Sequence, residues 1–166
     1  MSKRILLIED DEMTSKSIRD QVRRACQPAL IPVEFEFVST EHHAMNLVDS
    51  MGADNKFDIY IIDLMLPWAW GDNIEMPEDP RVIKDGALRA GFRVAEGIRK
   101  KEGADISKWR PMILYTVATI AAEMVGNGHQ QHYRYERIQK TDDEDKELAD
   151  RVRDLLSSGQ VATARS

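Results

Sequence analysis

Polar residues that can bind a metal ion or a phosphoryl group follow short apolar runs at four places in the sequence: Glu9-Asp10-Asp11, Asp63, Thr116 and Lys140. If these runs are neighbouring parallel strands, which lie about 4.8 Å apart, the polar side chains meet at one edge of a sheet. Clustered carboxylates repel one another unless a cation lies among them. Their oxygens suit a hard divalent ion such as Mg²⁺, which one or two carboxylates usually hold together with water and phosphate oxygens. The pattern therefore predicts a magnesium site.

Asp63 is the expected nucleophile of such a site. A carboxylate can attack phosphorus and carry the phosphoryl group as an aspartyl-phosphate. The ammonium of Lys140 would offset charge on the phosphoryl oxygens, and the hydroxyl of Thr116 would donate a hydrogen bond to one of them. Taken singly, these residues have ordinary structural explanations, as a helix cap, a strand-end threonine and a solvated lysine. Their joint placement favours the chemical interpretation.

The surrounding pattern is that of an α/β protein. Uninterrupted apolar runs are typical of strands buried on both faces of a parallel sheet, and strands are expected at residues 5–8, 33–38, 59–62, 112–115 and 137–139. Apolar residues with helical spacing predict helices around residues 18–26, 44–51, 88–98, 118–125 and 148–156. Strands that alternate with helices predict a five-stranded, parallel, doubly wound sheet with helices on both faces.

Three segments lie outside this regular pattern. Residues 67–86 include Trp68 and Trp70, three of the six prolines and no steady periodicity, so they predict a long loop. This loop is either a tolerated surface insertion or a lid or partner surface. His129 and His132 lie in a second irregular stretch, where solvated histidines are more common than metal ligands. We expect one domain over residues 1–156, followed by a flexible tail at 157–166.

Composition limits the partners. The chain has 166 residues, a formal charge of −6 and a pI near 5.3, which argues against a nucleic-acid-binding surface. Its apolar runs are too short to predict a membrane span or a signal peptide, and its single cysteine, Cys26, excludes an intramolecular disulfide. We therefore expect a cytoplasmic protein that acts through protein partners, without nucleic acid or membrane, and a homodimer is compatible with the sequence.

Two strings resemble the receiver domain of two-component response regulators: residues 3–12 (KRILLIEDDE) and residues 60–67 (YIIDLMLP). Residues 110–116 and 138–140 resemble the last two signature strands of that domain. The resemblance covers nearly the whole chain apart from residues 67–86 and the tail. It implies the flavodoxin-like strand order 2-1-3-4-5 in a single-domain receiver, with an insertion between the third strand and the third helix.

The resemblance also implies a role for each residue of the site. It implies that Asp63 is the phosphoacceptor and that Mg²⁺ is bound by Glu9, Asp10, Asp63 and the backbone carbonyl of Met65; Asp10 with Asp11 is the alternative acidic pair. Thr116 and Lys140 are implied to sense the phosphoryl group. The implied partners are a sensor histidine kinase or phosphotransfer protein and a downstream protein target. The chain would be a signalling phosphoacceptor rather than an enzyme, apart from self-catalysed phosphorylation and dephosphorylation of Asp63.

The sequence departs from the family pattern near the site. Val117 stands where the family has Ala or Gly, and Thr141 follows Lys140 in place of proline. Arg137 replaces an aromatic residue of the switch, for which Tyr135 is a candidate substitute. These departures leave open a pseudo-receiver, a protein-interaction scaffold that is not phosphorylated. A haloacid-dehalogenase-like phosphatase would need a second aspartate at position 65, where Met65 stands.

Overall fold

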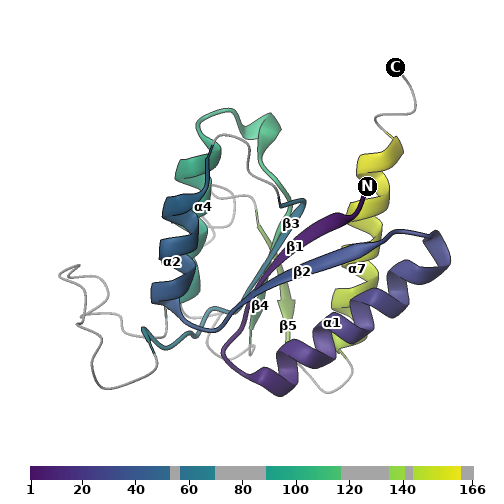
Figure 1. Ribbon diagram of the computed structural model, residues 1–166, viewed down its shortest axis with the longest axis horizontal. Coiled ribbons are helices and arrows are strands. Elements are labelled where there is room, and N and C mark those ends of the chain that lie inside the picture. The colour runs from purple at the N-terminus through teal and green to yellow at the C-terminus, as the bar shows by residue number, and fades with distance from the viewer. Residues whose placement is uncertain (53–56, 70–88, 117–134, 141–143, 162–166) are drawn as a thin grey trace.

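A parallel sheet forms the centre of the computed structural model, which describes residues 1–52, 57–69, 89–116, 135–140 and 144–161. Its five strands are β1 (Lys3–Ile8), β2 (Val33–Val38), β3 (Ile59–Ile62), β4 (Met112–Thr116) and β5 (Glu136–Gln139). They lie in the order β2-β1-β3-β4-β5, and every neighbouring pair is parallel (Figure 1). The predicted fold class and strand order are confirmed.

Helices cover both faces of this sheet. The α-helices of the described chain are α1 (Glu12–Cys26), α2 (Glu41–Ser50), α4 (Ala90–Glu102) and α7 (Glu144–Val161). α1 and α7 pack together on one face, and α2 and α4 pack together on the other (Figure 1). Two short 3-10 helices, η1 (Gln27–Ala29) and η3 (Ile106–Lys108), follow α1 and α4. Coverage of both faces explains why the inner strands have uninterrupted apolar runs.

Alternate residues of the inner strands enter two separate apolar layers. Leu6, Ile8 and Ile62 pack in the layer that includes α2 and α4. Ile5 and Leu7, from the same strand as Leu6 and Ile8, pack in the layer that includes α1 and α7. Successive side chains of a strand point to opposite faces, so one buried strand contributes to both layers. The polar residues that follow the strands lie beyond these layers, at the carboxyl edge of the sheet.

Side-chain caps determine where the first two helices begin. Asp11 Oδ1 accepts a hydrogen bond from the backbone N of Thr14 at 2.6 Å, and Thr40 Oγ1 accepts one from the backbone N of His43 at 3.2 Å. An N-cap of this kind satisfies a backbone donor that has no partner inside the helix. α1 therefore begins directly after the acidic turn that follows β1.

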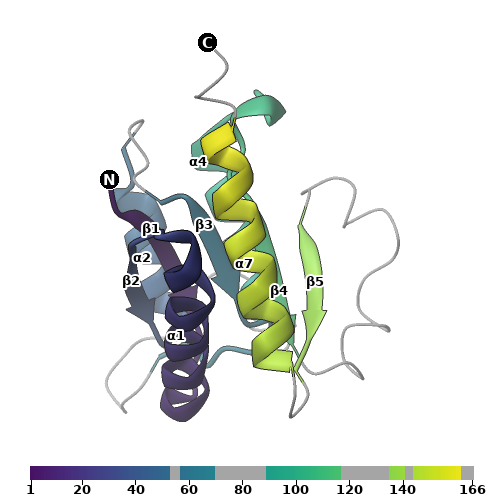
Figure 2. The same ribbon diagram turned by 90° about the vertical axis from the view of Figure 1, so that its right-hand side faces the viewer.

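The described segments test only part of the predicted irregular regions. α4 begins at Ala90, so of the predicted helix face only Leu88 lies outside the described residues. α7 continues to Val161, past residue 157 where the tail was expected to begin, and in Figure 2 it runs across β4 beside the edge strand β5. The described residues also exclude His129, His132 and the predicted helix at 118–125. No helix among those described is long and apolar enough to span a membrane.

Candidate functional site

Backbone hydrogen bonds bring the ends of β1 and β3 side by side. The backbone N of Glu9 donates to the carbonyl of Val38 on β2 at 3.0 Å, and the backbone N of Asp63 donates to the carbonyl of Ile8 at 2.8 Å. Both acidic residues are therefore held by main-chain contacts to a neighbouring strand. Because all the strands are parallel, their side chains emerge at the same carboxyl edge.

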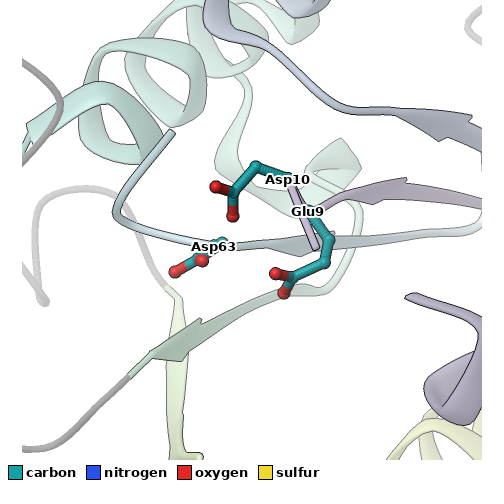
Figure 3. A group of neighbouring side chains, drawn as sticks. All are labelled: Glu9, Asp10 and Asp63. Carbon is teal, nitrogen blue, oxygen red and sulfur yellow. The ribbon is translucent and has the colours of Figure 1, made fainter. Parts of the chain in front are cut away.

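Three carboxylates meet at this edge. Glu9, Asp10 and Asp63 each offer an oxygen, and these oxygens all lie within 4.8 Å of one another (Figure 3). Glu9 is 1 % exposed and Asp63 is 5 % exposed, while Asp10 is half-buried. Within the described segments this is the only group of three or more metal-ligating side chains at such spacing. We call it the acidic cluster.

Lys140 reaches the acidic cluster from the end of β5. Its Nζ lies 2.7 Å from Asp63 Oδ2 and 2.7 Å from Glu9 Oε2, so one ammonium pairs with two buried carboxylates. The backbone N of Lys140 donates to the carbonyl of Thr116 at 2.8 Å, which fixes the lysine beside the end of β4. The predicted meeting of the acidic turn, the central aspartate and the lysine is thus present in the structure.

Burial controls the protonation of the site. Burial raises the pKa of Glu9 to about 7, although its contact with Lys140 acts in the opposite direction. Burial likewise raises the pKa of Asp63 above its ordinary value. Burial alone would lower the pKa of Lys140, but attraction to Asp63 and Glu9 outweighs it and leaves the pKa raised. Desolvation of the carboxylates is therefore only partly compensated by the lysine.

The donor set fits a divalent cation. With its three carboxylates ionised and Lys140 protonated, the acidic cluster has two uncompensated negative charges. Carboxylate oxygens are the ligands that Mg²⁺ prefers in proteins, and a charge of two would balance the remainder. Glu9, Asp10 and Asp63 are the described residues that could hold such an ion.

Asp11 lies outside the acidic cluster. Its exposed carboxylate caps α1, and the hydrogen bonds from Thr14 lower its pKa. Its backbone N donates to Glu9 Oε1 at 3.3 Å, so Asp11 contacts the cluster through its main chain only. Of the two acidic pairs considered from the sequence, the structure brings Glu9 and Asp10 to Asp63.

Met65 supports Asp63 through its backbone. Its amide N donates to Asp63 Oδ1 at 3.2 Å, while Asp63 Oδ2 accepts from Lys140. Each oxygen of the Asp63 carboxylate thus has a separate donor, which holds the carboxylate in one orientation. Metal binding by the backbone carbonyl of Met65 stays a prediction.

Thr116 has a buried hydroxyl without a partner. The side chain is 1 % exposed, and its Oγ1 has no hydrogen-bond partner among the described residues; the same holds for the hydroxyl of Tyr135. The register pairs Thr116 with Gln139, whereas Tyr135 lies one residue before β5 and contacts Phe92 of α4 at 6.0 Å between ring centroids. Strand pairing therefore does not bring Tyr135 beside Thr116. Arg137 is exposed, and Val117 lies outside the described residues.

Sequence reasoning missed Gly91. A Cβ on this residue would lie 2.1 Å from the carbonyl oxygen of Asp63, so the first turn of α4 packs directly on the backbone of Asp63. The backbone N of Gly91 also donates to the carbonyl of Leu64 at 3.1 Å. The helix that contacts Asp63 begins at Ala90, and the end of the insertion expected at residue 86 lies outside the described residues. The helical spacing of Gly91 with Val94, Ala95 and Ile98 is the signal that could have located it.

Comparisons with known proteins agree at the level of fold. No protein-family model matches the sequence, and no curated protein matches it. The structure is similar to that of the phosphorylated cyanobacterial phytochrome response regulator RcpA, with 17 % identity, coverage of 95 % of this chain and 96 % of that chain, and a TM-score of 0.62. A response regulator receiver domain from Rhodospirillum rubrum gives 14 % identity, 93 % and 94 % coverage and a TM-score of 0.57. A sensor protein from Polaromonas sp. JS666 gives 14 % identity, coverage of 89 % of this chain and 90 % of that chain, and a TM-score of 0.55. The chain therefore has the receiver fold.

Proposed function

We propose that this chain is a phosphoacceptor signalling protein of a two-component or phosphorelay system, and that phosphorylation of Asp63 switches its interaction with a protein partner. The observation that carries the proposal is the arrangement around Asp63. A buried carboxylate at the carboxyl edge of a receiver fold lies in a cluster of three carboxylates and contacts one ammonium, that of Lys140. The similarity in fold to RcpA, a phosphorylated response regulator, supports the same activity.

Glu9, Asp10 and Asp63 would hold Mg²⁺, with the backbone carbonyl of Met65 as a further ligand. When bound, the ion would supply positive charge for the carboxylates and for the oxygens of the incoming phosphoryl group. Glu9 must lose its proton before it can bind a metal ion, and its raised pKa lies close to neutral pH.

Asp63 would attack the phosphorus atom of a phosphohistidine in the partner. A bond forms between its carboxylate oxygen and phosphorus, and the bond between phosphorus and the histidine nitrogen breaks, with the electron pair left on that nitrogen. The amide N of Met65 keeps the carboxylate oriented during the attack. Lys140 would then pair with a phosphoryl oxygen. The buried hydroxyl of Thr116, for which the described segments offer no hydrogen-bond partner, would gain an acceptor.

The proposed donor is a sensor histidine kinase or a phosphotransfer protein, which implies the cytoplasm as the compartment. The proposed output is a change in binding to a downstream protein, because phosphorylation adds about two negative charges beside Lys140 and Thr116 and so biases two arrangements of the nearby segments. We propose that the receiver domain spans residues 1–156, with residues 67–86 as an inserted loop between β3 and α4.

Intact-mass spectrometry tests the proposal. The protein incubated with Mg²⁺ and acetyl phosphate should gain the mass of one phosphoryl group, and Asp63→Asn should gain none. Asp58→Asn is the matched control, because Asp58 precedes the same strand at the opposite edge, where it pairs with Lys3 at 2.9 Å. Asp58→Asn should be phosphorylated like the unaltered chain. An unchanged mass for the unaltered chain would contradict the proposal and favour a scaffold that is not phosphorylated.

A further inference from the structure

A second buried ion pair lies between the helices on one face of the sheet. Arg93 of α4 contacts Glu41 of α2 through two parallel hydrogen bonds, from Nε to Oε1 at 2.6 Å and from Nη2 to Oε2 at 2.7 Å. The side chains are 7 % and 2 % exposed. A bidentate ion pair of this kind holds both partners in one relative orientation. Its net contribution to stability is often small, because burying both charges is costly, so its geometry needs a separate explanation.

The two helices joined by this pair hold the same backbone segment. From α2, the backbone N of Glu41 donates to the carbonyl of Pro67 at 2.9 Å, and the next amide donates to Trp68 at 2.9 Å. From α4, the backbone N of Gly91 donates to the carbonyl of Leu64. The residues after Asp63 are therefore held at one end by α4 and at the other by α2.

We propose that Glu41 and Arg93 are positioning residues for the phosphoacceptor site. Their ion pair fixes the spacing between the first turns of α2 and α4, and through them the backbone from Asp63 to Pro67. That backbone carries the amide of Met65, which orients the Asp63 carboxylate. Neither side chain belongs to the acidic cluster, so both act through the main chain. This inference rests on the proposed function.

α4 offers a matched control for this proposal. Arg99 pairs with Glu102 on the same helix, and these side chains are 3 % and 4 % exposed. Glu102 also accepts a hydrogen bond from the backbone N of Arg110, just before β4 and away from the carboxyl edge. Arg99→Gln and Arg93→Gln thus remove the same charge from similarly buried pairs. Glu41, the partner of Arg93, donates its backbone N to Pro67 after Asp63, whereas Glu102, the partner of Arg99, bonds to the backbone just before β4.

Calorimetric titration of the full chain with Mg²⁺ tests the proposal, with urea denaturation to measure stability. Both substitutions should lower the stability, because each leaves a buried carboxylate without its partner. Arg93→Gln should also weaken Mg²⁺ binding by up to about 10-fold, the lower end of the effect of removing a group that hydrogen-bonds directly to a metal ligand, because Arg93 acts through the backbone. Arg99→Gln should leave the affinity unchanged. Arg93→Lys keeps the charge but cannot form the two parallel hydrogen bonds, so it should fold and give an intermediate Mg²⁺ affinity.

A metal-free measurement separates positioning from metal chemistry. Without Mg²⁺, the amide proton of Met65 should exchange faster with solvent in Arg93→Gln and Arg93→Lys than in Arg99→Gln. Equal Mg²⁺ affinity and equal exchange in the Arg93 and Arg99 variants, with the unaltered chain binding Mg²⁺, would overturn the positioning role alone. Failure of the unaltered chain to bind Mg²⁺ would overturn the proposed function, and the positioning role with it.

Discussion

Lys140 shows how a single charge supports the whole site. Its ammonium contacts two carboxylates that are almost fully buried, and Asp10 adds a third negative charge beside them. Lys140 supplies the positive charge that contacts the acidic cluster within the described residues, and those contacts raise the pKa of its ammonium. A metal ion bound by the same carboxylates would partly take over this task, so the importance of Lys140 for stability should depend on the metal.

Lys140→Met should therefore destabilise the protein by about 3 kcal/mol without Mg²⁺, because it leaves buried carboxylates without a counter-charge. The loss should be clearly smaller at saturating Mg²⁺. Urea denaturation in the presence and absence of Mg²⁺ measures both values. Lys3→Met is the control: Lys3 pairs with Asp58 at the opposite edge, both side chains are partly exposed, and its loss should stay below about 1 kcal/mol in either condition. Equal losses for Lys140→Met with and without Mg²⁺ would argue against a metal in the cluster.

The sequence predicted that the residues of the site meet, but it could not predict which of two adjacent aspartates caps α1. Residues that follow parallel strands must share an edge, so the placement of Asp63 and Lys140 followed from the strand pattern. Asp10 and Asp11 are adjacent, and either could have capped α1. In the structure Asp11 is the cap, since its side chain accepts the hydrogen bond from the backbone N of Thr14. The geometry of this cap depends on backbone angles that residue types alone do not specify.

Among the elements, α4 connects the site to the rest of the fold. Its first turn packs on the backbone of Asp63 through Gly91, its middle contacts α2 through Gly97, and its last turns carry the Arg99–Glu102 pair. A helix whose backbone packs against that of Asp63 tolerates no side chain at the contact. The two glycines of α4 should therefore respond in opposite ways to the same substitution.

Gly91→Ala should destabilise the protein by about 3 kcal/mol, because its Cβ would lie 2.1 Å from the carbonyl oxygen of Asp63 and the backbone would have to shift. Gly97→Ala should instead stabilise it by about 0.5–1 kcal/mol, since alanine favours a helix interior and its Cβ would meet Met45 and Val48 at an ordinary 3.5 Å. Urea denaturation gives both values. Destabilisation of similar size in the two variants would show that the first turn of α4 does not pack tightly against the backbone of Asp63.

The start of α4 and its ion pair show where prediction from sequence ended. The five strands, and the predicted helices that lie within the described residues, were predicted correctly, because their period reflects burial. The residues before Ala90 lack such a period, and the end of the insertion expected at residue 86 stays a prediction. Glu41 and Arg93 are 52 residues apart, and nothing in the local pattern links two charges on separate helices. Such contacts depend on how elements pack, which is known only once the fold is assembled.

For the whole molecule, Cys26 reports on the integrity of the fold. It is fully buried in the apolar layer that includes α1 and α7, and burial raises the pKa of its thiol. Only the thiolate is nucleophilic, so both burial and the raised pKa slow its reaction with an alkylating reagent. The layer that contains Cys26 includes side chains from several strands, so we expect its exposure to require opening of the whole domain rather than fraying of one element.

Iodoacetamide should therefore modify Cys26 far more slowly in the native protein than in urea, and Mg²⁺ should slow the native reaction further. A ligand that binds only the folded state lowers the open population by a factor of one plus the ratio of its free concentration to its dissociation constant. A concentration 100 times the dissociation constant should therefore reduce the rate about 100-fold. Mass spectrometry of quenched samples measures the rate. Asp10→Asn, which removes the least buried carboxylate of the acidic cluster, should lose most of this protection. An unchanged rate at saturating Mg²⁺ would mean that Cys26 becomes exposed by a local opening of α1 and α7 while the carboxyl edge stays folded.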